Sequence, residues 1–210
     1  VVHTGDFKVD YTPVFGDAID LQRLAELGKK GVLALMCDST NAERPGFTPS
    51  EKTVGKTFDN LFEEHKNTRI FVATFASNVD RVQQIINTAY KFGKKVCVEG
   101  RSMVSIIETA RNLECIKIPD NTLIEIDQLK NYPDEQQVII TTGSQGESMA
   151  ALSRMASNMH RKITIGAGDT VIFSSNPIPG NEKSVTKVIN ELLQKGADVI
   201  FQDAHVSGHA

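Results

Sequence analysis

The sequence predicts an α/β protein built on a parallel β-sheet flanked by helices, and two observations support this prediction. Short runs of consecutive apolar residues recur along the 210-residue chain, as expected for strands that are covered on both faces. The segments between these runs contain apolar residues at helical spacing. Strands and helices that alternate in this way imply right-handed crossover connections and therefore a parallel sheet.

Six short apolar runs are the predicted strands, and polar or turn-forming residues follow most of them. They cover Val32–Cys37, Arg69–Thr74, Lys95–Val98, Val138–Thr141, Thr170–Phe173 and Val199–Phe201. Because their apolar residues are consecutive rather than alternating, we expect a sheet that is buried on both sides.

Four amphipathic stripes are the predicted helices, and we interpret them as core rather than as cofactor contacts. The stripes are Val54, Phe58, Leu61 and Phe62; Val79, Val82, Ile85, Ile86 and Ala89; Met103, Ile106, Ile107 and Ala110; and Val185, Val188, Ile189, Leu192 and Leu193. The segment Thr48–Glu51 predicts the start of the first, with an N-cap threonine, a first-turn proline and a capping-box glutamate.

The composition is that of an ordinary globular protein, with 40% hydrophobic and 23% charged residues. No apolar run reaches the 18 or so residues that a membrane span needs, so no membrane association is expected. The net charge of −3 argues against a generally basic nucleic-acid binder, and any RNA contact requires a local basic patch. Three widely spaced cysteines, Cys37, Cys97 and Cys115, predict buried free thiols and a reducing, cytoplasmic location.

The polar segment Asp38–Pro49, which contains glycine and proline, is the predicted domain boundary. The chain also begins inside the apolar run Val1–Val2 and stops directly after the histidine motif Ser207–His209. We therefore expect a segment of a larger metal-dependent hydrolase.

Two aspartates are candidates for chemistry. Asp6 follows Gly5, which lets the backbone approach a ligand closely, and its carboxylate could bridge two divalent ions. Asp38 ends an apolar strand, where parallel sheets present functional groups, and could orient a catalytic histidine or act as an acid–base partner. Each also fits a structural role, Asp6 as a turn aspartate and Asp38 as an Asx turn or helix cap.

Two strand-to-helix turns are candidates for binding phosphate. Gly143–Glu147 contains glycines and free backbone N–H groups ahead of a helix predicted over Ser148–Ser157, so Ser144, Gln145 and Gly146 suit an anion. Ser144 and Glu147 equally fit a capping box. Arg101 opens the other helix, where the helix dipole disfavours a cation, which suggests an anionic ligand; a solvated surface arginine is the alternative.

The motif Ser207-Gly208-His209 places a histidine beside a hydroxyl and a glycine. Such a histidine can donate to a phosphate oxygen or protonate a leaving group, and a structural histidine is the alternative. The remaining histidines, His3, His65, His160 and His205, show no ligand-like spacing and receive no role.

Taken together, these motifs resemble the bacterial ribonuclease J family of metallo-β-lactamase nucleases with an inserted β-CASP domain. The matching pieces run in order along essentially the whole chain. They are HTGDFK (3–8), DSTNAE (38–43), FASNVDRVQQII (75–86), GRSM (100–103), TTGSQGESMAALSRMA (141–156), GDTVIFSSNPIPGN (168–181) and SGHA (207–210).

The resemblance implies a fold, a division into domains and a set of site residues. It implies a parallel Rossmann-like β-CASP sheet over residues 49–206, a partial metallo-β-lactamase αβ/βα unit over 1–48, and a return into that unit at 207–210. Asp6 matches the metal-bridging aspartate, Asp38 the acidic residue of the first β-CASP motif, and His209 the histidine that contacts the scissile phosphate. Ser207, Gly208, Arg101 and the Gly143–Glu147 turn would lie along the RNA.

The resemblance also implies a function for the parent protein, namely 5′-to-3′ exonucleolytic and endonucleolytic cleavage of RNA by a centre of two zinc ions, in a homo-oligomer. The chain lacks the His-x-His-x-Asp-His motif on which that centre depends, so we expect it to be inactive by itself. Two alternatives are a metallo-β-lactamase hydrolase that acts on a small substrate and a non-catalytic RNA-binding subunit of a nuclease complex.

Overall fold

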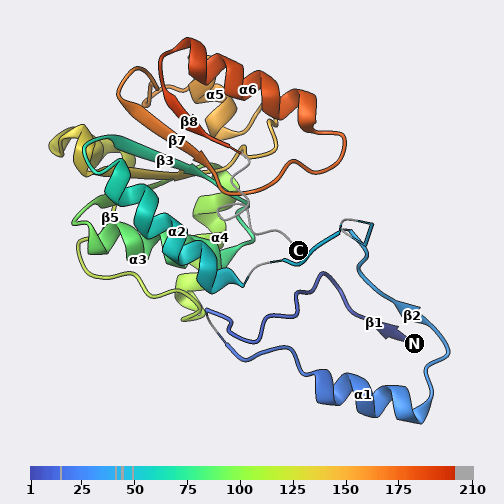
Figure 1. The fold of residues 1–210 in the computed structure, drawn as a ribbon. Helices are drawn as coiled ribbons and strands as arrows, with labels where there is room; N and C mark the ends of the chain where they lie inside the picture. Colours follow the sequence, from blue (N-terminus) through green and yellow to red (C-terminus); the bar gives the residue numbers. More distant parts are fainter. Residues whose placement is uncertain (15, 41, 44, 49, 202–210) are drawn as a thin grey trace.

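The computed structural model describes residues 1–201 except 15, 41, 44 and 49. Its centre is a six-stranded parallel sheet with the strand order β5-β4-β6-β3-β7-β8 and helices on both faces (Figure 1). The predicted fold class, a parallel α/β sheet flanked by helices, is confirmed.

The six strands of the sheet are β3 (Arg69–Ala73), β4 (Lys95–Glu99), β5 (Leu123–Ile124), β6 (Gln137–Thr141), β7 (Asp169–Phe173) and β8 (Asp198–Ile200). The four inner strands, β3, β4, β6 and β7, agree with the predicted runs to within one residue at each end. In the register, Ile70 of β3 lies between Val138 of β6 and Thr170 of β7. The short edge strand β5 was not predicted, because two residues leave no recognisable pattern.

Side chains alternate between the two faces of the sheet and form two separate cores. On β3, Ile70 and Val72 belong to one cluster, whereas Phe71 and Ala73 belong to the other. The first cluster is covered by α2 (Glu51–Glu64), α3 (Val79–Lys91) and α4 (Arg101–Asn112). The second is covered by α5 (Ala151–Ala156), α6 (Glu182–Gln194) and the 3₁₀ turn η1 (Ile126–Asn131); a second such turn, η2 (Asp134–Gln136), precedes β6.

The N-terminal segment forms its own small unit beside this sheet (Figure 1). Strand β1 (Val2–His3) pairs in parallel with β2 (Leu35–Met36), and α1 (Leu21–Lys30) connects them. The predicted strand Val32–Cys37 is therefore reduced to two residues, and its side chains are exposed. The prediction that all three thiols are buried is wrong for Cys37, because no second layer covers this unit in the described residues; Cys97 is buried and Cys115 is half-buried.

Two predicted helix starts differ from the structure. The N-cap of α2 is Ser50, whose Oγ accepts a hydrogen bond from the backbone N–H of Lys52, rather than Thr48. Helix α5 begins at Ala151 rather than Ser148, because residues 143–150 first make two turns, closed by the bonds from Gly146 N to Gly143 O and from Ala150 N to Glu147 O. Ser144 and Glu147 consequently form no capping box.

Within the described residues, no helix combines the length and the apolar character that crossing a membrane demands.

Candidate functional site

Three of the predicted phosphate-binding positions follow strand β6 at the carboxyl edge of the sheet. Because all six strands are parallel, the segments after β3, β4, β6 and β7 gather at this one edge. The chain leaves β3 and β4 toward helices on one face, whereas it leaves β6 toward a helix on the other. Neighbouring strands whose connections diverge in this way open a crevice between them, which is where α/β sheets bind ligands.

Helix α4 places Arg101 at that crevice. Its N-cap is Gly100, which adopts φ +109° and lies so close to the neighbouring turn that an added Cβ would come within 2.5 Å of the Thr142 hydroxyl. The close approach explains why glycine precedes the helix. Arg101 itself is exposed, and together with Thr142 and Glu147 it lines a hollow of about 440 Å³.

The Gly143–Glu147 turn is held in place by its own side chains. The buried Gln145 side chain donates from Nε2 to the carbonyl of Asn176 at 2.9 Å, and its Oε1 accepts from the backbone N–H of Ile178 at 2.7 Å. Gln145 therefore fastens the turn after β6 to the loop after β7. Ser144 is buried too, and the backbone N–H groups of Gln145 and Gly146 already donate to the Glu147 carboxylate and to the carbonyl of Gly143. The predicted free N–H groups of this turn are therefore engaged within the turn itself.

Gly146 makes the tightest contact in the turn. It adopts φ +72°, and an added Cβ would lie 2.4 Å from the backbone carbon of Ser184 in the first turn of α6. The glycine predicted to bind phosphate is thus required for packing the turn against α6.

The two candidate aspartates are brought close together by the N-terminal unit. The loops that follow β1 and β2 run side by side, since Thr4 N donates to the carbonyl of Met36 and Asp38 N donates to the Thr4 hydroxyl. Asp6 lies two residues beyond Thr4 on the first loop, and its side chain is exposed.

Asp38 forms the Asx turn that was the structural alternative for this residue. Its Oδ1 accepts from the Thr40 hydroxyl at 2.6 Å and from the Thr40 backbone N–H at 3.0 Å. These two hydrogen bonds hold the pKa of the Asp38 carboxyl below its ordinary value, so the group is ionised at neutral pH. An ionised carboxylate can still orient a histidine, and Asp38 lines a hollow of about 360 Å³ with Phe7 and Lys8.

A chain of polar contacts connects the loop that bears Asp6 to the carboxyl edge of the sheet. Lys8 Nζ lies 3.2 Å from Glu51 Oε1 at the start of α2, and Glu51 also pairs with Arg81 at 3.0 Å. Arg81, which is 1% exposed, donates to the carbonyl of Ser174 at the end of β7. Sequence reasoning gave Arg81 no role, because these partners are 30 and 93 positions away along the chain.

A second unpredicted pair lies at the end of β4. His160 Nε2 is 3.1 Å from Glu99 Oε1, while His160 Nδ1 accepts the backbone N–H of Ile163 at 3.1 Å. Since Nδ1 is an acceptor, the ring proton lies on Nε2 and is donated to the carboxylate. The sequence showed no spacing that links these residues, which are 61 positions apart.

The described residues do not form a metal centre by themselves. They contain no group of three or more histidine, cysteine, aspartate or glutamate side chains that could hold an ion. Asp6 could supply one ligand, but a dinuclear zinc site needs several. Ser207, Gly208 and His209 lie outside the described residues.

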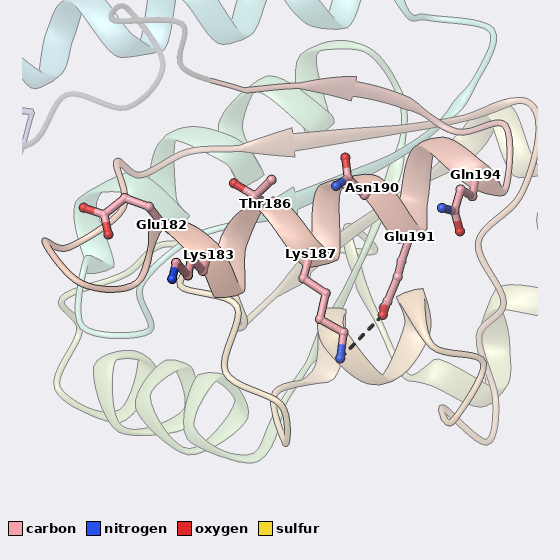
Figure 2. A pocket seen from close by; sticks show the side chains of 7 residues that line it. All are labelled: Glu182, Lys183, Thr186, Lys187, Asn190, Glu191 and Gln194. Atoms are coloured by element: carbon pink, nitrogen blue, oxygen red, sulfur yellow. Dashed lines mark ion pairs between the residues drawn. The ribbon is translucent and has the colours of Figure 1, made fainter.

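A larger hollow of about 590 Å³ runs along the outer face of α6, from Glu182 at the start of the helix to Gln194 at its end (Figure 2). Its side chains are polar and of both charges, and Lys187 pairs with Glu191 at 3.8 Å. The groups on this face neutralise one another rather than converge, so we place the candidate site at the carboxyl edge.

Comparison with known proteins identifies the family. The model of the ribonuclease J β-CASP domain matches residues 67–192, more than half of the chain. The chain belongs to the ribonuclease J family. Over its full length it is 51% identical to ribonuclease J of Synechocystis, 52% identical to ribonuclease J 1 of Streptococcus pyogenes and 45% identical to ribonuclease J2 of Bacillus subtilis.

The chain spans only about a third of these relatives, with 33%, 38% and 38% of their respective lengths covered. The β-CASP match covers strands β3 to β7 and nearly all of α6, and therefore includes the carboxyl edge at which Arg101 and the Gly143–Glu147 turn lie.

Proposed function

We propose that this chain is the β-CASP part, with an adjoining metallo-β-lactamase segment, of a ribonuclease that hydrolyses RNA phosphodiester bonds. Family membership supports the proposal most strongly, because the relatives of this chain are named as ribonucleases J and match the chain along its whole length. The carboxyl edge of the six-stranded sheet would form one wall of the RNA-binding cleft.

We assign the candidate residues to two sides of that cleft. Asp6 and Asp38 lie on neighbouring loops of the N-terminal unit, which suits a metal ligand beside an acid–base partner. Arg101 lines the hollow at the sheet edge and would contact a phosphate. The turn that contains Ser144, Gln145 and Gly146 lies beside it and would border the RNA. Ser207, Gly208 and His209 would complete the phosphate side, with His209 donating a proton to the leaving oxygen.

The proposal includes metal ions, which in this fold would supply the hydroxide that attacks phosphorus. We expect two zinc ions, held mainly by residues that the structure does not describe or that lie elsewhere in a full-length ribonuclease J, with Asp6 as the contribution of this chain. A cytoplasmic homo-oligomer is the expected state of that full-length protein.

The test compares RNA cleavage and metal content in a full-length protein that contains this chain. His209→Ala should lower the rate on a 5′-phosphorylated RNA by about 10²–10⁴-fold, as for loss of a general acid, and should retain the metal. Asp6→Ala should reduce metal content, and Asp17→Ala, an exposed aspartate, is the control.

The purified 210-residue chain should show no metal-dependent cleavage. Equal loss of metal in His209→Ala and Asp6→Ala would make His209 a ligand instead of an acid. Hydrolysis of a small ester without cleavage of RNA by the full-length protein would overturn the nuclease assignment.

A further inference from the structure

We propose that Glu51 is a positioning residue for RNA cleavage, which together with Asp10 fastens the loop that bears Asp6 to the six-stranded sheet. This inference rests on the proposed function and deepens it, because it assigns a task to the contacts between the two sides of the proposed cleft. Asp6 follows β1 in the N-terminal unit, whereas Arg101 belongs to the sheet. The contacts that join these two parts therefore set the distance between a metal ligand and the phosphate.

The N-terminal unit contributes no described side chain to either hydrophobic core. Both clusters, and the half-buried apolar residues packed against them, consist of residues from position 54 onward. Polar contacts join the two parts instead, and we call the residues that make them, Lys8, Asp10, Ser50 and Glu51, the latch. Because hydrogen bonds depend on direction as well as on distance, the latch fixes how the loop lies on the sheet.

Asp10 caps helix α2, although it lies 41 positions before Glu51 in the sequence. Its Oδ2 accepts the backbone N–H of Glu51 at 2.9 Å and the hydroxyl of Ser50, the N-cap, at 3.0 Å. Its Oδ1 accepts the backbone N–H of Thr12 at 2.9 Å, which shapes the loop itself. The dipole of α2 adds to the attraction for this carboxylate. Asp10 therefore seats the loop on the first turn of α2.

Glu51 joins the same loop to the interior of the sheet domain. Its Oε1 lies 3.2 Å from Lys8 Nζ and 3.0 Å from Arg81 Nη2. The side chains of Lys8, Glu51 and Arg81 are 18%, 14% and 1% exposed, so water and salt screen these two pairs little. Arg81 continues to the carbonyl of Ser174 after β7, and Gln145 connects the loop after β7 to the turn after β6.

The position of the loop affects the chemical step more than it affects RNA binding. Attack on phosphorus requires the reacting atoms to lie about 3–3.5 Å apart, and a displacement of about 1 Å can lower the rate about 10²-fold. The binding of RNA is instead spread over many phosphates. Asp6 remains within its own unit when the latch is loosened, so the metal should stay bound. A loosened latch should therefore lower kcat and leave KM and metal content nearly unchanged.

The test measures kcat, KM and metal content of a full-length protein that contains this chain, with a 5′-phosphorylated RNA as the substrate. Glu51→Gln, which removes the charge and keeps the shape, should lower kcat by about 10- to 100-fold, with KM and metal content nearly unchanged. Glu63→Gln, which breaks an exposed pair with Lys66 at the end of the same helix, is the matched control and should leave kcat at the wild-type value.

Lys8 provides a second variant, on the loop side of the latch. Lys8→Met should lower kcat without raising KM, and Lys8→Arg, which keeps the charge, should recover most of the loss. Because Lys8 and Glu51 act through one contact, the double variant should be no slower than Glu51→Gln alone. Losses that multiply in the double variant, or a raised KM in Lys8→Met, would show that Lys8 contacts the RNA itself and would overturn the proposal.

Spin labels give a readout that does not depend on cleavage. One label is attached to Cys37, which is exposed on the N-terminal unit, and the other to Lys187→Cys on the outer face of α6, with the other reactive cysteines replaced. Pulsed electron paramagnetic resonance of the full-length protein should give one narrow distribution of distances between the labels. Glu51→Gln should shift or broaden this distribution, and Glu63→Gln should not.

Failures of the two proposals are distinguishable. An unchanged kcat in Glu51→Gln, or a lowered kcat with an unchanged distance distribution, overturns the positioning role and leaves the proposed nuclease function intact. A full-length protein that cleaves no RNA overturns the nuclease function, and the distances then support or overturn the latch. If thermal unfolding reveals a folding defect in Glu51→Gln, the comparison of Lys8→Met with Lys8→Arg decides the matter.

Discussion

At the scale of single residues, Arg81 joins three parts of the molecule that are distant in sequence. It is buried, pairs with Glu51 at the start of α2 and donates to Ser174 at the end of β7. Through Glu51 it also reaches Lys8, two residues from Asp6. One side chain thereby holds the loop that bears a proposed metal ligand against the edge proposed to bind phosphate.

Replacing Arg81 with methionine should destabilise the chain by about 1–3 kcal/mol, because Glu51 keeps only Lys8 as a charged partner and the carbonyl of Ser174 loses a buried donor. Denaturant unfolding measures the change. Arg23→Met, which breaks an exposed pair with Glu26, is the control and should cost no more than about 1 kcal/mol. If the two variants lost similar free energies of unfolding, the buried Arg81–Glu51 pair would stabilise the chain no more than an exposed pair does.

The cysteines differ enough in environment to be told apart chemically. Burial, with smaller contributions from Glu99 and Glu125, raises the pKa of the Cys97 thiol to about 12. Cys37 is exposed on the N-terminal unit. At pH 8, alkylation should modify Cys37 readily and Cys97 only after unfolding, because the thiolate is the reactive form. Mass spectrometry of peptides from the chain and from Cys37→Ser checks this, and rapid labelling of native Cys97 would contradict its placement in the core.

At the scale of elements, burial decided what could be predicted from the sequence. Strands β3, β6 and β7 are covered on both faces, so their consecutive apolar residues predicted them. Helices α2, α3, α4 and α6 are buried on one face, so their apolar residues at helical spacing predicted them. Helix α1 contains no buried residue, and β5 has two residues, so neither gave a usable signal.

Only part of the candidate site could be predicted from the sequence. Arg101 and the Gly143–Glu147 turn were found because glycine-rich turns after strands are visible in a sequence. The Glu99–His160 pair was not predicted, because these residues are 61 positions apart in the sequence and only the fold brings them together.

The turn after β6 offers a test of packing at this scale. Gly146→Ala should place a methyl group against the backbone of Ser184 and Val185, in addition to straining a positive φ. Gly168→Ala is the matched control, with φ +89° and open space around the added methyl.

We expect Gly168→Ala to cost about 1–2 kcal/mol and Gly146→Ala about 1–3 kcal/mol more. The free energies of unfolding of both variants give the comparison. Equal costs would mean that the turn is not packed against α6 as described.

At the scale of the whole molecule, the two cores are drawn entirely from residues after position 53. The six-stranded sheet should therefore fold without the N-terminal unit. A chain of residues 48–206 should unfold cooperatively, with stability lowered by about 1–3 kcal/mol through loss of the Asp10 and Lys8 contacts to the start of α2. Thermal and denaturant unfolding measure this, and a non-cooperative transition would show that residues 1–47 complete the core.

The central claim is that RNA lies along the carboxyl edge of the six-stranded sheet, and mapping of cross-links tests it most directly. A 5′-phosphorylated oligonucleotide that contains 4-thiouridine is irradiated with a full-length protein that includes this chain, and the linked peptides are sequenced by mass spectrometry. Links are expected within residues 99–103 and 141–154, and they should be reduced in Arg101→Gln. Links concentrated on the later turns of α6, around Lys187 and Gln194 (Figure 2), would contradict this claim.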